Sequence, residues 1–179
     1  MWCGIRWWRA SSRPTRRPTG SIRHPSGAAG GRTAPRPEVV ELAIQGLRAQ
    51  RGLPARSTLR RWVLLALEST TPAQLTVRFV GRTEARTLNR DFRGRDYATN
   101  VLTFDYARAP LAADIVLCLP VIRREAREQG KTLRAHLAHL VIHGVLHARG
   151  FDHERPRAAR QMEARERRLL AALRIADPY

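Results

Sequence analysis

Three histidines with the spacing of metal ligands stand in the stretch HGVLHARGFDH, at positions 143, 147 and 153. On an α-helix, positions four apart lie about 40° apart in rotation and roughly 6 Å apart in rise, so His143 and His147 present their rings to one point. Gly150 fits the left-handed position that often ends a helix, which lets the chain bring His153 to the same point. Three imidazoles with a fourth position open are the arrangement of catalytic zinc. The spacing therefore predicts one Zn²⁺ per chain, held by these three histidines.

Two more histidines, His136 and His139, stand earlier on the same helix. Taking His143 as zero, they fall at about +20° and −40°, on the same side as the ligands. Apolar residues cover nearly all the remaining surface, which predicts a buried helix whose line of histidines needs hydrogen-bond partners. We expect His136 and His139 to line the site or to hydrogen-bond behind it, because three ligands already suffice.

The elements that must position this helix follow from hydrophobic periodicity. The run 113–119 is almost continuously apolar, which is typical of a central strand, and residues 91–99 predict a polar loop with Gly94 as its flexible point. The order β-α-β-α-β-β-α-α-α predicts an α+β fold, a small mixed β-sheet packed with helices. Its expected elements are strand 38–45, helix 58–68, strand 75–80, helix 83–89, strands 100–106 and 113–119, helix 121–129, the histidine helix, and helix 157–173.

Residues 1–37 differ in composition from the rest of the chain. They contain eight arginines and no acidic residue, with Pro, Gly and Ser throughout, which predicts a basic disordered extension. A transit peptide, an RNA-binding arm and a start codon assigned too far upstream are the alternatives, and we favour the last. Residues 38–179 then form a single domain. Removing the eight arginines from the net charge of +18 leaves +10 on that domain.

The charge of the 179-residue chain comes almost wholly from arginine, since Lys131 is its only lysine. Such a balance indicates a polyanionic partner, with nucleic acid the first candidate, although a GC-rich coding sequence also raises arginine content. Cys3 and Cys118 do not form a disulfide framework, which fits the reducing cytoplasm. No apolar run reaches the 18 residues of a membrane span, so we expect no membrane partner. The sequence leaves the oligomeric state open.

The pattern H-x3-H-x2-G-x2-H is also that of the metzincin zinc peptidases. In those enzymes a glutamate beside the first histidine is the general base, and here that place is Gly144. A peptidase of this type would lack its base. We therefore interpret the pattern as a zincin-like site, at the end of a buried histidine helix, with different chemistry.

Two longer segments resemble one family throughout. HGVLHARGFDH resembles the pattern H-G-x-L-H-x-x-G-[YF]-D-H, and LNRDFRGRDYATNVLTF at 88–104 resembles LN-x3-R-G-x-D-x-x-T-N-V-L-S-F. Both patterns are those of the YbeY family, bacterial metal-dependent endoribonucleases that mature ribosomal RNA. Segments 114–118, 125–130, 136–144 and 159–166 also look like family segments in the family's order, so the resemblance covers roughly residues 38–179.

The chain departs from the family's pattern at a few positions. Ala98, Thr103 and Ala113 stand where the family has proline, serine and glycine, and Ala148–Arg149 replaces a bulky apolar pair. None of these changes removes an expected ligand. Arg149 is expected to bring a charge close to the metal. The family also lacks the extension 1–37.

The resemblance implies His143, His147 and His153 as zinc ligands and Arg93 as the arginine of the active cleft. It implies a zinc-dependent, single-strand-preferring endoribonuclease in 16S rRNA 3′-end maturation and ribosome quality control. Its partners would be ribosomal RNA and the small ribosomal subunit, with ribosomal or assembly proteins as further candidates.

Physical chemistry agrees with these roles. A divalent ion polarises a phosphoryl oxygen and lowers the pKa of bound water to about 7, and an arginine pairs with phosphate oxygens through two N–H groups. RNA carries its own 2′-hydroxyl nucleophile, so a protein base is less necessary. Asp152 is the nearest carboxylate in sequence, and we expect it to orient a histidine ring rather than to take a proton.

Two other functions stay open on the sequence. One is a zincin-like hydrolase of another ester or peptide bond. The other is a non-catalytic ribosome-assembly factor whose metal is structural, with His139 or Asp152 as a fourth ligand. A basic stripe of Arg82, Arg86 and Arg90 fits either a solvated helix face or a phosphate contact.

Overall fold

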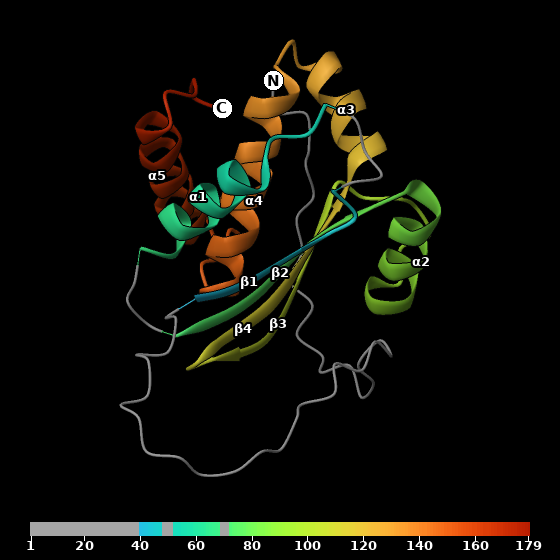
Figure 1. The fold of residues 1–179 in the computed structure, drawn as a ribbon, viewed down its shortest axis with the longest axis horizontal. Coiled ribbons are helices and arrows are strands. Elements are labelled where there is room, and N and C mark those ends of the chain that lie inside the picture. The colour runs from blue at the N-terminus through green and yellow to red at the C-terminus, as the bar shows by residue number, and fades with distance from the viewer. Residues whose placement is uncertain (1–39, 48–51, 69–71) are drawn as a thin grey trace, which may run out of the picture.

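The computed structural model describes residues 40–47, 52–68 and 72–179. The predicted extension 1–37 and the first residues of the strand predicted at 38–45 lie outside the described residues. The predicted order of elements is confirmed in the described part of the chain (Figure 1). The elements are β1 (Val40–Gln45), α1 (Arg56–Leu67), β2 (Ala73–Val80), α2 (Arg82–Arg93), β3 (Val101–Arg108), β4 (Leu111–Cys118), α3 (Leu119–Glu128), α4 (Leu133–Ala148) and α5 (Pro156–Ala172).

The four strands form one mixed sheet in the order β1-β2-β4-β3. β2 pairs in parallel with both β1 and β4, and β3 runs antiparallel to β4. β4 is therefore an interior strand, with Val77 beside Ile115 on one flank and Val101 beside Leu117 on the other. Its apolar side chains are buried on both faces, as its nearly unbroken apolar sequence predicts.

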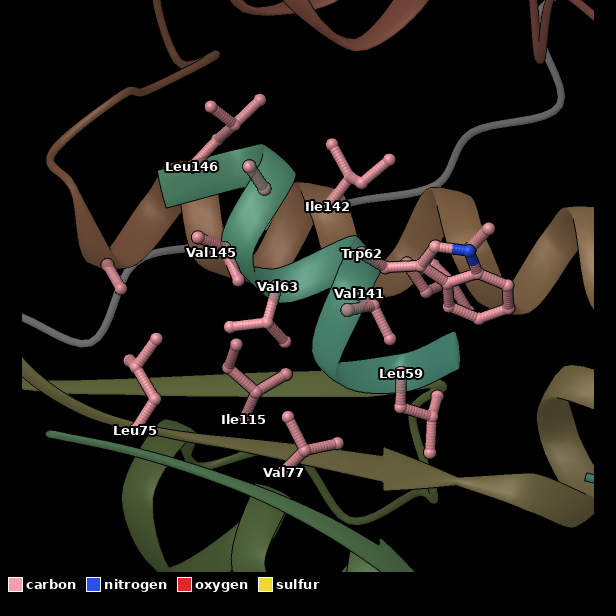
Figure 2. Packing of buried hydrophobic residues seen from close by; sticks show 14 of the residues in the cluster. Leu59, Trp62, Val63, Leu75, Val77, Ile115, Val141, Ile142, Val145 and Leu146 are labelled. Carbon is pink, nitrogen blue, oxygen red and sulfur yellow. The ribbon is translucent and has the colours of Figure 1, made fainter. Parts of the chain in front are cut away.

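Alternating side chains of the sheet supply two separate cores. On one face, Val77 and Ile115 join the main core, which also holds residues of α1 and α4. Figure 2 shows Val63 of α1 above Ile115 in this core, which Val141 of α4 also joins. On the other face, Leu102 and its neighbours pack against α2 in a smaller core. Figure 1 shows α1, α4 and α5 together on one side of the sheet and α2 on the other.

The histidine helix α4 is the most buried helix of the described chain. Twelve of its 16 residues are buried, which confirms the prediction made from its apolar circumference. Each fully buried Leu or Val contributes about 1.5–3 kcal/mol, so this helix is held firmly between α1, α3, α5 and the sheet. Thr132 caps its start by accepting a hydrogen bond from the N–H of Ala135 at 3.1 Å.

The prediction of a polar loop at 91–99 is wrong for residues 91–93, which belong to α2. Helix α2 continues to Arg93 and ends at Gly94, whose φ of 65° is left-handed and whose N–H donates to Arg90 O at 2.9 Å. The extra turn forms because Phe92 has a partner in the smaller core, where its ring meets the ring of Phe104 edge-on at 5.2 Å. The charged residues around Phe92 make the sequence resemble a polar loop, so the contact with Phe104 could not be predicted from it.

Candidate metal centre

Two turns of α4 and the segment that follows bring the three predicted ligands together. His143 and His147 stand on consecutive turns, and α4 ends as expected at Gly150, whose φ is 93°. The N–H of Gly150 donates to His147 O at 2.8 Å and that of Phe151 to Leu146 O at 3.0 Å, which is a Schellman ending. The reversal returns His153 to the two helical histidines.

The geometry of the three rings fits a single metal ion. His143 Nε2 and His147 Nε2 are 3.0 Å apart, and one nitrogen of each of the three histidines lies within 4.8 Å of the others. Nitrogens bound to one tetrahedral ion at 2.0–2.1 Å would lie about 3.3 Å apart. The ring centroid of His153 is 5.5 Å from that of His143 and 4.8 Å from that of His147. The donor set therefore matches an all-imidazole site.

The fully buried carboxylate of Glu166 on α5 fixes one of these rings. Its Oε1 accepts a hydrogen bond from His143 Nδ1 at 2.6 Å. The proton on Nδ1 leaves the Nε2 of His143 as a lone-pair donor facing His147. Metal-binding histidines commonly donate their second N–H to a carboxylate in this way, which sets both the tautomer and the ring orientation.

Burial keeps the two helical histidines in the neutral form, which can bind a metal ion. Burial lowers the pKa of His143, and it lowers the pKa of His147 to about 2, with the neighbouring His143 and His153 adding to the effect. Both rings are therefore neutral at physiological pH. Burial alone would raise the pKa of Glu166, but His143 and His139 outweigh it and hold that pKa below its ordinary value. Glu166 is therefore a buried, charged carboxylate beside the neutral rings of His143 and His147.

Sequence reasoning missed Glu166, although a signal was present. On the predicted helix 157–173, position 166 falls on the same face as Met162, Leu169 and Leu170, all of which are buried. A carboxylate on a buried helix face costs several kcal/mol unless a partner satisfies it. A glutamate on that buried face therefore predicts a polar partner inside the fold, and the histidine helix offers such partners.

The three remaining predicted neighbours of the site have different contacts. His139 lies behind the ligands, with its Nε2 3.5 Å from Glu166 Oε2, as predicted. His136 instead pairs with Glu125 of α3 at 3.0 Å. Asp152 Oδ1 accepts the backbone N–H of His153 at 2.6 Å and of Glu154 at 3.0 Å, so it shapes the turn that carries the third ligand.

Arg149, which is expected to bring a charge close to the metal, is paired with groups at the end of α1. Its Nη1 donates to Ala66 O at 2.8 Å and to Glu68 Oε2 at 3.0 Å, both at the end of α1. Arg165 and Arg168 of α5 also bind Glu68. The Glu68 carboxylate therefore connects α1 with the end of α4 and with α5, and it forms an ion pair with Arg149.

Gly144 lies where helix and sheet meet most closely. A Cβ at this position would stand 2.8 Å from Ile115 Cγ2 and 3.2 Å from Thr103 Oγ1. A glutamate here would collide with β3 and β4, so the general base of a metzincin cannot be supplied from this position. The likeness to those peptidases is confined to the spacing of the ligands.

Arg93 stands apart from the histidines, in the last turn of α2 on the other side of the sheet. It is half-buried, and burial lowers the pKa of its guanidinium to about 10, so it stays charged at neutral pH. Within the described ranges, its Nε is buried without a hydrogen-bond partner and it forms no ion pair. On the same helix Arg86 binds Asp96 through two contacts, and Arg90 binds Asp91. Two members of the basic stripe are thus already paired.

Comparisons with known proteins converge on one family. A family model described as "Endoribonuclease YbeY" matches residues 53–174. The chain is 57% identical over 127 residues to Endoribonuclease YbeY of Aromatoleum aromaticum, covering 70% of this chain and 81% of that protein. It is 52% identical over 143 residues to Endoribonuclease YbeY of Methylibium petroleiphilum, covering 79% of this chain and 95% of that protein.

One solved structure extends the comparison to the fold. The solution structure of TM1509 from Thermotoga maritima matches with a TM-score of 0.52 and 25% identity, covering 77% of this chain and 98% of that one. Among the helices of the described residues, none combines the length and the apolar character that crossing a membrane requires.

Proposed function

The chain belongs to the YbeY endoribonuclease family and is an RNA-cleaving hydrolase, and from that premise we propose that it depends on zinc, prefers single-stranded RNA and acts in 16S rRNA 3′-end maturation and ribosome quality control. We place its action in the cytoplasm on the small ribosomal subunit. Ribosomal or assembly proteins are further candidate partners.

The observation that carries the proposal is the cluster of His143, His147 and His153 with Glu166 behind it. These residues would hold one Zn²⁺, which when bound supplies a Lewis acid for a phosphoryl oxygen. Three protein ligands leave a fourth position for substrate, as in catalytic zinc sites, whereas structural sites use four protein ligands. His139, a candidate fourth ligand, has its Nε2 3.5 Å from Glu166 Oε2.

The other residues of the chain would orient the RNA and the ligands. Glu166 keeps the lone pair of His143 directed at the metal position. We propose that Arg93 pairs with a phosphate of the RNA, because its charge is neutralised by no described carboxylate and its planar fork suits two phosphate oxygens. The 2′-hydroxyl of the RNA can serve as nucleophile. We assign Asp152 the positioning of His153 through the backbone.

The proposal is tested by measuring metal content and RNA cleavage together on the purified full chain. We expect about one zinc per chain, cleavage of single-stranded RNA, loss of cleavage with a chelator, and recovery when zinc is returned. Zinc-loaded protein that binds RNA but never cleaves it would favour the assembly factor with a structural metal. Cleavage that continues after complete metal removal would contradict the metal-dependent mechanism.

A further inference from the structure

The segment after α5 returns to the metal site through a tyrosine. The hydroxyl of Tyr179 donates a hydrogen bond to Oε2 of Glu166. The ring of Tyr179 also meets the ring of His139 edge-on, with centroids 5.6 Å apart. The contact is chemically specific, because Glu166 is the carboxylate that orients His143.

The two oxygens of Glu166 have divided roles. Oε1 faces His143 Nδ1 at 2.6 Å, while Oε2 accepts from Tyr179 and lies 3.5 Å from His139 Nε2. The side chain is fully buried, so each oxygen depends on protein donors to replace water. A donor on Oε2 fixes the rotation of the carboxylate about its last bond, and that rotation sets the direction of Oε1.

The tyrosine is itself held in place by contacts from two other elements. Lys131, just before α4, donates from Nζ to Pro178 O at 2.6 Å. Arg167 of α5 pairs with Asp177 at 3.0 Å and lies over the Tyr179 ring at 4.9 Å. Asp177 Oδ1 also accepts the backbone N–H of Tyr179 at 3.1 Å. The hydroxyl thus reaches Glu166 from an anchored segment.

We infer that Tyr179 is a positioning residue of the metal site, acting through Glu166 on His143. The inference rests on the metal site proposed above. Hydrogen bonds arranged in series strengthen one another in a buried setting, so the hydroxyl makes the carboxylate a better-directed acceptor and His143 a better-placed ligand. Loss of a group that contacts a ligand typically costs about 10–100-fold in metal affinity. One step further away, we expect a loss of about 3–10-fold.

The deciding experiment measures zinc affinity by competition with a chromophoric chelator, using the full chain. Tyr179→Phe keeps the ring against His139 and removes only the hydroxyl. We expect about 3–10-fold weaker zinc binding and a changed visible spectrum of the cobalt-substituted protein. Tyr106→Phe is the matched control, because it removes a tyrosine hydroxyl from Asp114 at 2.9 Å on the α2 face of the sheet. That control should bind zinc like the wild type.

A double-mutant cycle separates positioning from general packing. If Tyr179 acts through Glu166, then Tyr179→Phe should cost almost nothing further in a Glu166→Gln background, since coupled residues are not additive. Lys131→Met loosens the anchoring segment from another element and should weaken zinc binding in the same direction, which keeps the inference testable if Tyr179→Phe folds poorly.

Three results would overturn the inference. Wild-type zinc affinity in Tyr179→Phe or, should that variant not fold, in Lys131→Met would remove the role of Tyr179 and leave the metal site standing. Full additivity with Glu166→Gln would show that Tyr179 does not act through the carboxylate. A wild-type chain that binds no zinc or cobalt would remove the metal site and the inference together.

Discussion

On one face of the sheet, histidines of α4 pair with carboxylates of neighbouring helices, whereas on the other face α2 ends in an arginine whose Nε no described residue satisfies. Glu166 contacts His143 and Tyr179, and the exposed Glu68 pairs with Arg149, just after α4, and with Arg165 of α5. Arg93 is half-buried yet lacks a carboxylate partner among the described residues. On the first face the carboxylate behind His143 is already in place, whereas on the second face Arg93 has no described carboxylate beside it.

This difference suggests a division of function, with metal binding on the first face and pairing with the substrate on the second. A metal site needs ligands locked in place by their own partners, because small displacements weaken coordination. A group that pairs with substrate must instead keep its hydrogen-bonding capacity until the substrate binds. An unsatisfied buried guanidinium nitrogen in a native fold calls for such an explanation. Substitutions at four places in the structure follow, from the largest expected effect to the smallest.

The largest effect should come from the ligands themselves. His143→Ala, His147→Ala or His153→Ala should each reduce zinc from one per chain to near zero and abolish RNA cleavage, measured by metal analysis and a cleavage assay. The rise in melting temperature that zinc gives the wild type should disappear as well, because zinc stabilises only a state that binds it. His136→Gln is the control and should still bind zinc, because His136 pairs with Glu125. Stoichiometric zinc in all three alanine variants would refute the ligand assignment.

Arg93→Ala should show the opposite pattern, with metal retained and chemistry lost. We expect cleavage to fall about 10²–10³-fold, the typical value of one positioned electrostatic contact, while zinc content is unchanged. Arg93→Lys should recover only part, since lysine lacks the planar fork. Arg86→Ala is the control, because Arg86 is exposed on the same helix and already bound to Asp96. If Arg93→Ala cleaves as fast as the wild type, Arg93 has no catalytic role.

Glu166→Gln should affect the metal face without removing a ligand. The amide cannot accept from His143 Nδ1 as strongly as the carboxylate does, so we expect zinc affinity to fall about 10–100-fold. Competition with a chelator measures the change. Glu128→Gln on α3, which removes an exposed carboxylate paired with Arg124, is the control. Equal affinities in the two variants would mean that the carboxylate behind His143 does not tune the site.

The smallest effect should appear at Glu68 and depend on pH. Burial alone would raise the pKa of Glu68, but hydrogen bonds from Arg149, Arg165 and Arg168 outweigh it and lower that pKa below its ordinary value. A carboxyl with a lowered pKa stabilises the fold above its unfolded pKa, about 4.3, and loses that contribution as pH falls through the folded pKa. Solvent screens these pairs, so Glu68→Gln should cost about 1 kcal/mol at pH 7.

Urea unfolding at pH 7 and at pH 3 measures this contribution. The difference between wild type and Glu68→Gln should shrink at the lower pH. Asp96→Asn on the α2 face, which breaks the exposed pair with Arg86, should lose less at pH 7. A Glu68→Gln penalty that grows as the pH falls would show that folding raises the pKa of Glu68 instead of lowering it.

Much of this protein is determined by patterns that a local stretch of sequence carries. The order of the elements, the interior position of β4 and the burial of α4 follow from hydrophobic periodicity, which depends only on neighbours along the chain. The same holds for the candidate metal ligands. His143 and His147 share one helix, and the turn at Gly150, three residues beyond, returns His153, so local geometry brings the three histidines together.

The tertiary structure decided everything that depends on contacts between distant segments. Glu166 is 23 residues from His143, and Arg149 is 81 residues from Glu68, so no periodicity connects them. The last turn of α2 forms because Phe92 meets Phe104 of β3, and Gly144 excludes a glutamate because the sheet stands against it. Spacing within one helix fixes which side chains can share a metal. Only packing between elements determines which partners orient them and which charges are left for a substrate.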